Sequence, residues 1–307
     1  MNIKSLDHIL DLAKKIGPKK VAVALAEDEE ILVALERAKE EKIVEPILVG
    51  TKDKIEALAK SNGIDLEDFE IIQQGNGFEA SKLCCQFLNS GKADVIMKGL
   101  VDSSTFLQAV LDKENGLHKM RMLSHVAVFE IPAYPKLLIV TDAGVNIAPK
   151  VDEKAEIIRN AIRVAHSLGI DNPLVACVAA VEKINPKMPA TLDAQELSNM
   201  SRRGEIEGGI VDGPFGLDNA VSEISARIKK ISSPVAGKAD IILAPDIECG
   251  NVIYKSLVEF AKARCAAIVV GANKPVVLTS RADSDENKFM SIALGVVNTA
   301  ILKQQGG

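Results

Sequence analysis

The feature that most constrains the fold of this 307-residue chain is an alternation of short β-branched runs with longer amphipathic segments. The short runs read as strands at residues 21–25, 46–49, 69–72, 94–97, 126–129, 137–141, 174–179, 209–212, 240–244, 266–270 and 276–278. Helical patterns separate them, and in the second half these patterns cover residues 154–168, 194–203, 219–230, 251–263 and 287–302. Strands that alternate with helices pair mostly in parallel, because a parallel connection needs a crossover. The sequence therefore predicts an α/β protein with mostly parallel sheets and helices on both faces.

Length, charge and composition narrow the class of protein. At roughly 150 residues per domain, the chain is long enough for about two domains with their own cores. The 37 basic and 42 acidic residues give a formal net charge of −5, and aromatic residues are only 3%, so a nucleic-acid partner is not expected. A Pro-containing stretch at residues 131–135 is typical of a linker or of a loop between two strands.

Membrane and secretory segments are not expected. No apolar run approaches the ~18 residues that a membrane span requires. Residues 3–16 have the periodicity of an amphipathic helix, unlike a signal peptide. Five cysteines without C-x-x-C spacing indicate neither a zinc site nor a redox pair, and they favour a reduced, cytoplasmic setting.

Polar segments follow several predicted strands at their carboxyl ends, where ligands gather in sheets of this type. In the first segment Lys98 and Gly99 precede three hydroxyls, Ser103, Ser104 and Thr105, where a helix should begin. Backbone N–H groups at a helix start, together with a cation and hydroxyls, suit a phosphate. The alternative is that Ser103 or Ser104 only caps the helix and that Lys98 is solvated.

Three more segments place acids and amides after strands. Asp142 and Asn146 can bind a ligand or form a simple turn of the Asx type. Asp212 stands at the end of the predicted strand 209–212, where a simple turn explains the presence of an acid less well. The third segment leads into a helix and contains Asp246, Gly250 and Asn251.

The last segment contains Ser280 and Arg281 before a long terminal helix. A hydroxyl donor beside a planar cation is a combination that stabilises a developing oxyanion or binds a phosphoryl group. Residues 75–80 match a dinucleotide-binding pattern, but the next strand ends at Met97 and Lys98 without the acid that such a site needs. A tight turn into a helix is therefore the preferred interpretation of residues 75–80.

Together the ordered blocks resemble the phosphate acetyl/butyryl transferase family over nearly the whole chain. The blocks are Met97-Lys98-Gly99, Asp142 with Asn146, residues 185–191, Asp212-Gly213-Pro214 with Asp218, Pro245-Asp246 with Gly250-Asn251 and Tyr254-Lys255, and residues 279–284. The resemblance implies reversible transfer of a short acyl group, butyryl before others, between coenzyme A and inorganic phosphate. It implies no metal and no cofactor, and it implies a homo-oligomer.

The resemblance also implies a fold and a set of roles. Two α/β domains of the isocitrate/isopropylmalate dehydrogenase type are expected, residues 1–135 plus 277–307 and residues 136–276, with the active site in the cleft between them. Ser280 and Arg281 are the implied catalytic residues. The implied substrate-binding residues are Lys98, Gly99, Ser103, Ser104, Thr105, Asp142, Asn146, Asp212, Asp246, Gly250, Asn251 and Lys255.

One position departs from the family pattern. Asn287 stands where acetyl-transferring relatives have an aspartate that deprotonates the coenzyme A thiol, and an amide cannot act as that base. Asp283 or Asp285 can take the role, or the thiol ionises without a base. The sequence therefore does not identify the general base.

Other functions stay open at this point. A metal- and NAD-dependent dehydrogenase of the same fold would use Asp142, Asp212 and Asp246 as metal ligands. An acetyl-specific phosphate acyltransferase, a fatty-acyl phosphate synthase of related fold and a non-catalytic binding module are further alternatives.

Overall fold

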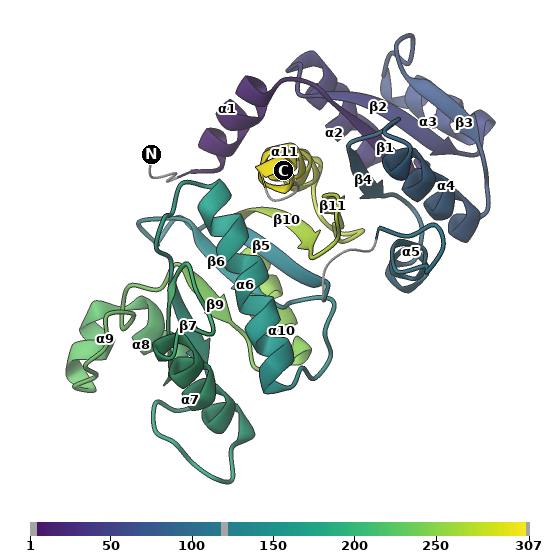
Figure 1. The fold of residues 1–307 in the computed structure, drawn as a ribbon. Coiled ribbons are helices and arrows are strands. Elements are labelled where there is room, and N and C mark those ends of the chain that lie inside the picture. Colours follow the sequence, from purple (N-terminus) through teal and green to yellow (C-terminus); the bar gives the residue numbers. More distant parts are fainter. Residues whose placement is uncertain (1–4, 118–121, 305–307) are drawn as a thin grey trace. The chain divides into compact units, whose positions relative to one another are not determined.

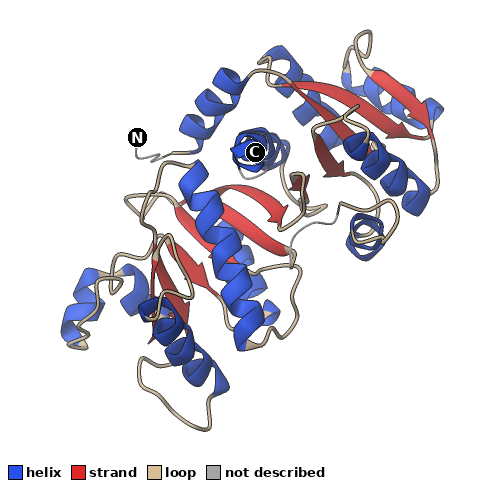
Figure 2. Cartoon of the chain, viewed as in Figure 1, coloured by secondary structure: helices blue, strands red, loops and turns tan. Residues whose placement is uncertain are grey.

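The computed structural model describes residues 5–117 and 122–304, and it shows the predicted alternation of strands and helices (Figures 1 and 2). The strands are β1 (Lys19–Ala24), β2 (Val44–Gly50), β3 (Glu70–Gln73), β4 (Val95–Lys98), β5 (Ser124–Glu130), β6 (Leu138–Thr141), β7 (Leu174–Val178), β8 (Ile210–Phe215), β9 (Ile241–Leu243), β10 (Arg264–Val270) and β11 (Val276–Val277). The helices are α1 (Leu6–Ile16), α2 (Glu29–Glu40), α3 (Lys52–Asn62), α4 (Gly77–Asn89), α5 (Ser103–Val110), α6 (Val151–Ser167), α7 (Pro189–Arg202), α8 (Leu217–Val221), α9 (Glu223–Ile228), α10 (Ile247–Glu259) and α11 (Asp285–Gln304). Each predicted strand overlaps an observed one, so the predicted α/β class is confirmed.

The chain forms two compact units, and it visits one of them twice. Unit 1 contains residues 1–6 and 121–265, and unit 2 contains residues 7–120 and 266–307. These divisions fall earlier along the chain than the predicted boundaries after residues 135 and 276. The Pro-containing stretch at 131–135 joins β5 to β6, which pair antiparallel, with Ala127 opposite Val140. It is therefore a hairpin loop inside unit 1, which was one of its two sequence interpretations.

Unit 2 has the strand order β3-β2-β1-β4-β11-β10. All neighbours pair in parallel except β10 and β11. The strand β1 is central and its residues Val21 to Ala24 are fully buried, which is why its sequence is an uninterrupted small and β-branched apolar run. Helix α11 packs against α2, β4 and β11, and α4 packs against β1 and α5. The last helix of the chain thereby belongs to the unit that the N-terminal strands build.

Unit 1 has the strand order β5-β6-β9-β7-β8, parallel except for the β5–β6 hairpin. Helix α6 lies against β5, β6 and β9, as Figure 1 shows, and α7 packs on β7 and β8. The single helix predicted over residues 219–230 is wrong, because α8 ends at Val221 and Ser222 interrupts the helical backbone. This residue has an extended backbone, and its side chain accepts a hydrogen bond from the Ser225 N–H to start α9.

Among residues 5–117 and 122–304, no helix combines the length and the apolar character needed to cross a bilayer. This agrees with the absence of a long apolar run in the sequence.

Candidate active site

Three neighbouring strands of unit 2 bring residues that are far apart in sequence to one edge of the sheet. In β4 Lys98 lies opposite Ala24 of β1, and Met97 lies opposite Val277 of β11. Because these strands are parallel, the segments that follow their carboxyl ends share one edge. Lys98 ends β4 and Arg281 follows β11, so the strand order unites two of the predicted site residues.

Lys98 is buried, with 3% of its surface exposed. Its Nζ donates hydrogen bonds to the carbonyl oxygens of Gly99 and Val101, each 3.2 Å away. Within the described part of the chain, no carboxylate lies within 4.0 Å of this ammonium group. Burial lowers the pKa of Lys98, and the nearby positive charge of Arg281 lowers it further. The alternative of a solvated Lys98 is thus wrong, and a buried cation without an anionic partner favours an anionic ligand.

Gly99 makes the turn between β4 and the next helix. Its N–H donates to Ala24 O at 2.9 Å. A Cβ at this position would lie 2.0 Å from the carbonyl oxygen of Leu25. Only glycine therefore allows β4 and the end of β1 to approach so closely.

The hydroxyl residues after this turn form the start of α5. Ser103, Ser104 and Thr105 all lie in its first turn, and the N-cap residue is Asp102, whose side chain makes no capping hydrogen bond. The alternative that Ser103 or Ser104 caps the helix is wrong. The first turn therefore keeps N–H groups that no side chain of the N-cap occupies, as an anion-binding helix start requires.

Arg281 contacts this helix start through Asp102. Its Nη2 lies 2.5 Å from Asp102 Oδ1, and the two side chains are 56% and 75% exposed. An ion pair so open to water contributes little to stability. The guanidinium can therefore exchange Asp102 for a bound anion at small cost.

Ser280 is held by a short turn before α11. Its N–H donates to Asp283 Oδ2 at 2.7 Å, and its Oγ accepts from the Ala282 N–H at 3.3 Å. Asp283 is 4% exposed and Asn287 is 7% exposed. The N–H of Asn287 donates to Ser284 Oγ, and its carbonyl accepts from Ser291. Asp283 is thus a carboxylate in direct contact with the backbone of Ser280.

A second cluster of predicted residues lies in unit 1 around Asp142, which is 2% exposed. Its Oδ1 accepts from the N–H groups of Gly144 at 2.8 Å and Val145 at 2.9 Å. Its Oδ2 accepts from His125 N at 3.1 Å and from Asn146 Nδ2 at 2.6 Å. The turn that the sequence predicted at Asp142 is confirmed, and the carboxylate is fully engaged in holding it.

The start of α10 packs onto this turn. Asp246 is the N-cap and accepts from Cys249 N at 2.8 Å. A Cβ on Gly250 would lie 2.1 Å from Asp142 O, and Asn251 Nδ2 donates to Ala143 O at 3.3 Å. Lys255 follows one turn later on the same helix, with Nζ 5.5 Å from the centroid of the Tyr254 ring.

Asp212 does not join this cluster. Strand β8 continues to Phe215, so the prediction that Asp212 ends its strand is wrong. Its carboxylate accepts from the hydroxyls of Ser198 at 2.7 Å and Ser233 at 2.6 Å. Strands β9 and β7 separate it from β6, and the described residues contain no group of three or more side chains arranged to hold a metal ion. The three acids proposed for a dehydrogenase metal site are therefore not assembled within unit 1.

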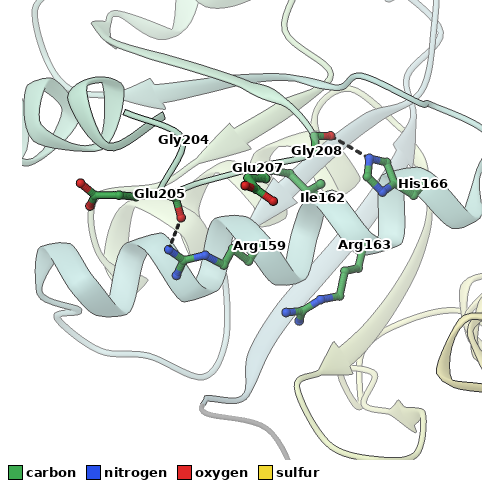
Figure 3. A pocket seen from close by; sticks show the side chains of 8 residues that line it. All are labelled: Arg159, Ile162, Arg163, His166, Gly204, Glu205, Glu207 and Gly208. Carbon is green, nitrogen blue, oxygen red and sulfur yellow. Dashed lines mark hydrogen bonds between the residues drawn. The ribbon is translucent and has the colours of Figure 1, made fainter. Parts of the chain in front are cut away.

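Unit 1 also has a pocket of about 520 Å³ that contains none of the predicted site residues (Figure 3). One wall is the face of α6 with Arg159, Arg163 and His166, and the other is the segment 204–208. Arg159 Nη2 donates to Glu205 O at 2.6 Å, and His166 Nε2 lies 2.7 Å from Gly208 O. In Figure 3 the side chains of Arg159 and His166 thus hold this segment against α6.

Known proteins are similar to this chain over nearly its whole length. The family model described as phosphate acetyl/butaryl transferase matches residues 5–88 and 76–296. The phosphate butyryltransferase of Clostridium acetobutylicum is 50% identical over 295 residues, which are 96% of this chain and 98% of that protein. The phosphate acetyltransferase of Thermotoga maritima is 44% identical over 292 residues, 95% of this chain and 99% of that protein. The crystal structure of a branched-chain phosphotransacylase from Enterococcus faecalis V583 has a TM-score of 0.80 at 33% identity and covers 91% of this chain and 99% of its own.

Proposed function

The chain belongs to the phosphate acetyl/butaryl transferase family, and we propose on that basis that it transfers a short acyl group reversibly between coenzyme A and inorganic phosphate. The acyl group is butyryl in preference to acetyl. This choice is supported by the 50% identity with a phosphate butyryltransferase, against 44% with a phosphate acetyltransferase.

The chemistry requires a cation and hydrogen-bond donors more than it requires a cofactor. A phosphate oxygen attacks the thioester carbonyl, the C–S bond breaks, and the products are the acyl phosphate and the coenzyme A thiolate, which takes up a proton. The route passes through a tetrahedral oxyanion beside the phosphate, so negative charge accumulates at one place. Positive groups held there in advance lower the barrier.

The observation that carries the proposal is the buried ammonium of Lys98, which has two carbonyl acceptors and no carboxylate within 4.0 Å in the described chain. An ammonium uses three donors, so one N–H stays available for a phosphate oxygen. The start of α5, with Ser103, Ser104 and Thr105, adds N–H and hydroxyl donors. Lys98 and this helix start together bind the phosphate.

Arg281 and Ser280 act on the reacting atoms. Arg281 leaves Asp102 and pairs with the phosphate, where its planar guanidinium stabilises the charge that develops in the transition state. Ser280 donates its hydroxyl to the thioester carbonyl or to the sulfur. Holding both substrates in this arrangement supplies a further part of the acceleration.

The unit 1 residues divide by what their side chains already bind. Asp142, Asn146 and Asp246 hold the turn and the start of α10, and Gly250 allows their close approach. We assign these four an indirect part in substrate binding. Asn251 and Lys255 have more exposed side chains and are the residues expected to contact coenzyme A. Asp212 stays a substrate-binding prediction from the resemblance alone.

Assembly and location complete the proposal. We expect this protein to be a homo-oligomer, because the family resemblance implies one. Size-exclusion chromatography with light scattering measures the oligomeric state directly. All cysteines in the described part are free, which suits a reducing, cytoplasmic location for an enzyme that uses coenzyme A.

The decisive experiment measures thiol release from acetyl-, butyryl- and octanoyl-coenzyme A, with and without phosphate, in the presence of a chelator and without nicotinamide. Phosphate-dependent release that is fastest with butyryl-coenzyme A supports the proposal. Two CH₂ groups are worth about 1.6 kcal/mol on burial, so the preference over acetyl should be at most about 15-fold. Release without phosphate identifies a thioesterase, and no release refutes acyl transfer. A maximum with acetyl or octanoyl overturns the butyryl preference.

A further inference from the structure

Lys288 is a second buried lysine close to the proposed phosphate site. It lies in the first turns of α11, with 1% of its side chain exposed. Its Nζ is 3.2 Å from Asp28 Oδ1 and 3.6 Å from Glu30 Oε2. A lysine buried to this degree is costly unless it is paired, so the contact with Asp28 is what keeps it in place.

Asp28 connects this lysine to the phosphate site. It follows β1, the strand beside β4, and it caps α2 by accepting from Ile31 N at 3.0 Å. The charge of Asp28 raises the pKa of Lys98, and the charge of Lys288 lowers it, so both groups lie near enough to act on Lys98. Asp28 is thus an anion close to Lys98 that forms its short contact with Lys288 instead.

We propose that Lys288 is a positioning residue that holds the Asp28 carboxylate on α2 and so leaves Lys98 without an internal anionic partner. Lys98 is then ready for the phosphate of the substrate. The inference rests on the proposed function. Lys288 itself touches no substrate, and it acts by occupying the carboxylate that would otherwise compete with phosphate for Lys98. The same ion pair ties the start of α11, and therefore the turn containing Ser280 and Arg281 before it, to α2.

The test is a cycle of two substitutions. Lys288→Met leaves Asp28 free to pair with Lys98, and we expect the KM for phosphate to rise about tenfold or more, with a smaller change in kcat. In Lys288→Met with Asp28→Asn the competing charge is gone, while asparagine still caps α2. The KM for phosphate should then return to within about threefold of the original value.

The cycle separates a charge effect from simple damage to the fold. If Lys288 only stabilises the packing, removal of Asp28 as well cannot restore the KM. Glu29→Gln is the matched control, because Glu29 is an exposed carboxylate on the same turn of α2, and its KM should not change. If Lys288→Met does not fold, the double variant, in which no Asp28 charge is left without Lys288, carries the test through the same threefold criterion.

Two results overturn the inference. One is an unchanged KM for phosphate in folded Lys288→Met, and the other is a double variant whose KM stays as high as that of the single variant. Binding of inorganic phosphate, measured by calorimetry without acyl-coenzyme A, separates this inference from the proposed function. If the original protein binds phosphate but transfers no acyl group, the function fails while the cycle still decides the role of Lys288. If the original protein binds no phosphate, both fail.

Discussion

Replacement of Lys98 by methionine should lower activity without lowering stability. Lys98 has three N–H donors, of which two bind carbonyl oxygens, so one charge-assisted hydrogen bond to phosphate is lost. Such a bond is worth about 1.5–3 kcal/mol, which corresponds to a loss of about 10- to 150-fold in kcat/KM for phosphate. Methionine has nearly the same length and no charge to bury.

The stability side of this prediction follows from the pKa of Lys98. Burial lowers that pKa in the folded protein below its value in the unfolded chain. The unfolded chain therefore binds more protons between the two pKa values, and the free energy of unfolding rises with pH through that window. Below the lowered pKa the charged lysine opposes folding fully. Lys98→Met removes this penalty, so its Tm at neutral pH should equal or exceed that of the original protein.

Thiol-release kinetics at varied phosphate concentration test the loss of activity. Thermal unfolding followed by circular dichroism tests the expected Tm. Lys20→Met is the control, because Lys20 is exposed near the start of β1, at the other end of the strand from the site. A kcat/KM for phosphate that stays within about threefold of the original value in Lys98→Met refutes a role of Lys98 in phosphate binding. A large fall in Tm would equally refute the view that Lys98 is an unpaired cation kept for a ligand.

Three further substitutions test the site. Arg281→Ala should reduce turnover by roughly 10²-fold or more, because it removes the cation at the developing charge, and an unchanged kcat/KM in a folded variant excludes that role. Asn287→Asp introduces the acid that the family resemblance led us to expect at this position, and its pH–rate profile tests whether a base is needed. Faster thiol attack near neutral pH means that a base is missing, and an unchanged profile means that none is needed. Gly250→Ala should lower the free energy of unfolding by about 1–3 kcal/mol, because the alanine Cβ would lie 2.1 Å from Asp142 O. Chemical denaturation measures this free energy. An unchanged value would mean that α10 can shift away from the turn at Asp142.

The sequence alone predicted the class of fold and the position of its strands. This succeeded because the apolar pattern of a segment records its local burial: Val21 to Ala24 are apolar throughout since β1 is covered on both sides. Local patterns were less reliable at the ends of elements. Asp102 occupies the N-cap position of α5 instead of a serine, and β8 continues past Asp212. Several polar residues near a helix start are equally good N-cap candidates in the sequence. Only the backbone conformation shows which of them is the N-cap.

The sequence predicted the residues of the site only as members of separate segments. The segments of Lys98 and Arg281 follow neighbouring strand ends because β11 pairs with β4, a neighbour relation that no local pattern contains. The ion-pair partners of Arg281 and Lys288 could not be predicted from the sequence either. Arg281 pairs with Asp102 and Lys288 pairs with Asp28, and each pair joins segments that are far apart along the chain. The sequence therefore determined which groups are present, because side-chain chemistry and burial pattern are local properties. The tertiary structure decided which charges are paired, and among the described residues it leaves Lys98 with no carboxylate within 4.0 Å, because pairing depends on strand order and helix packing across the whole unit.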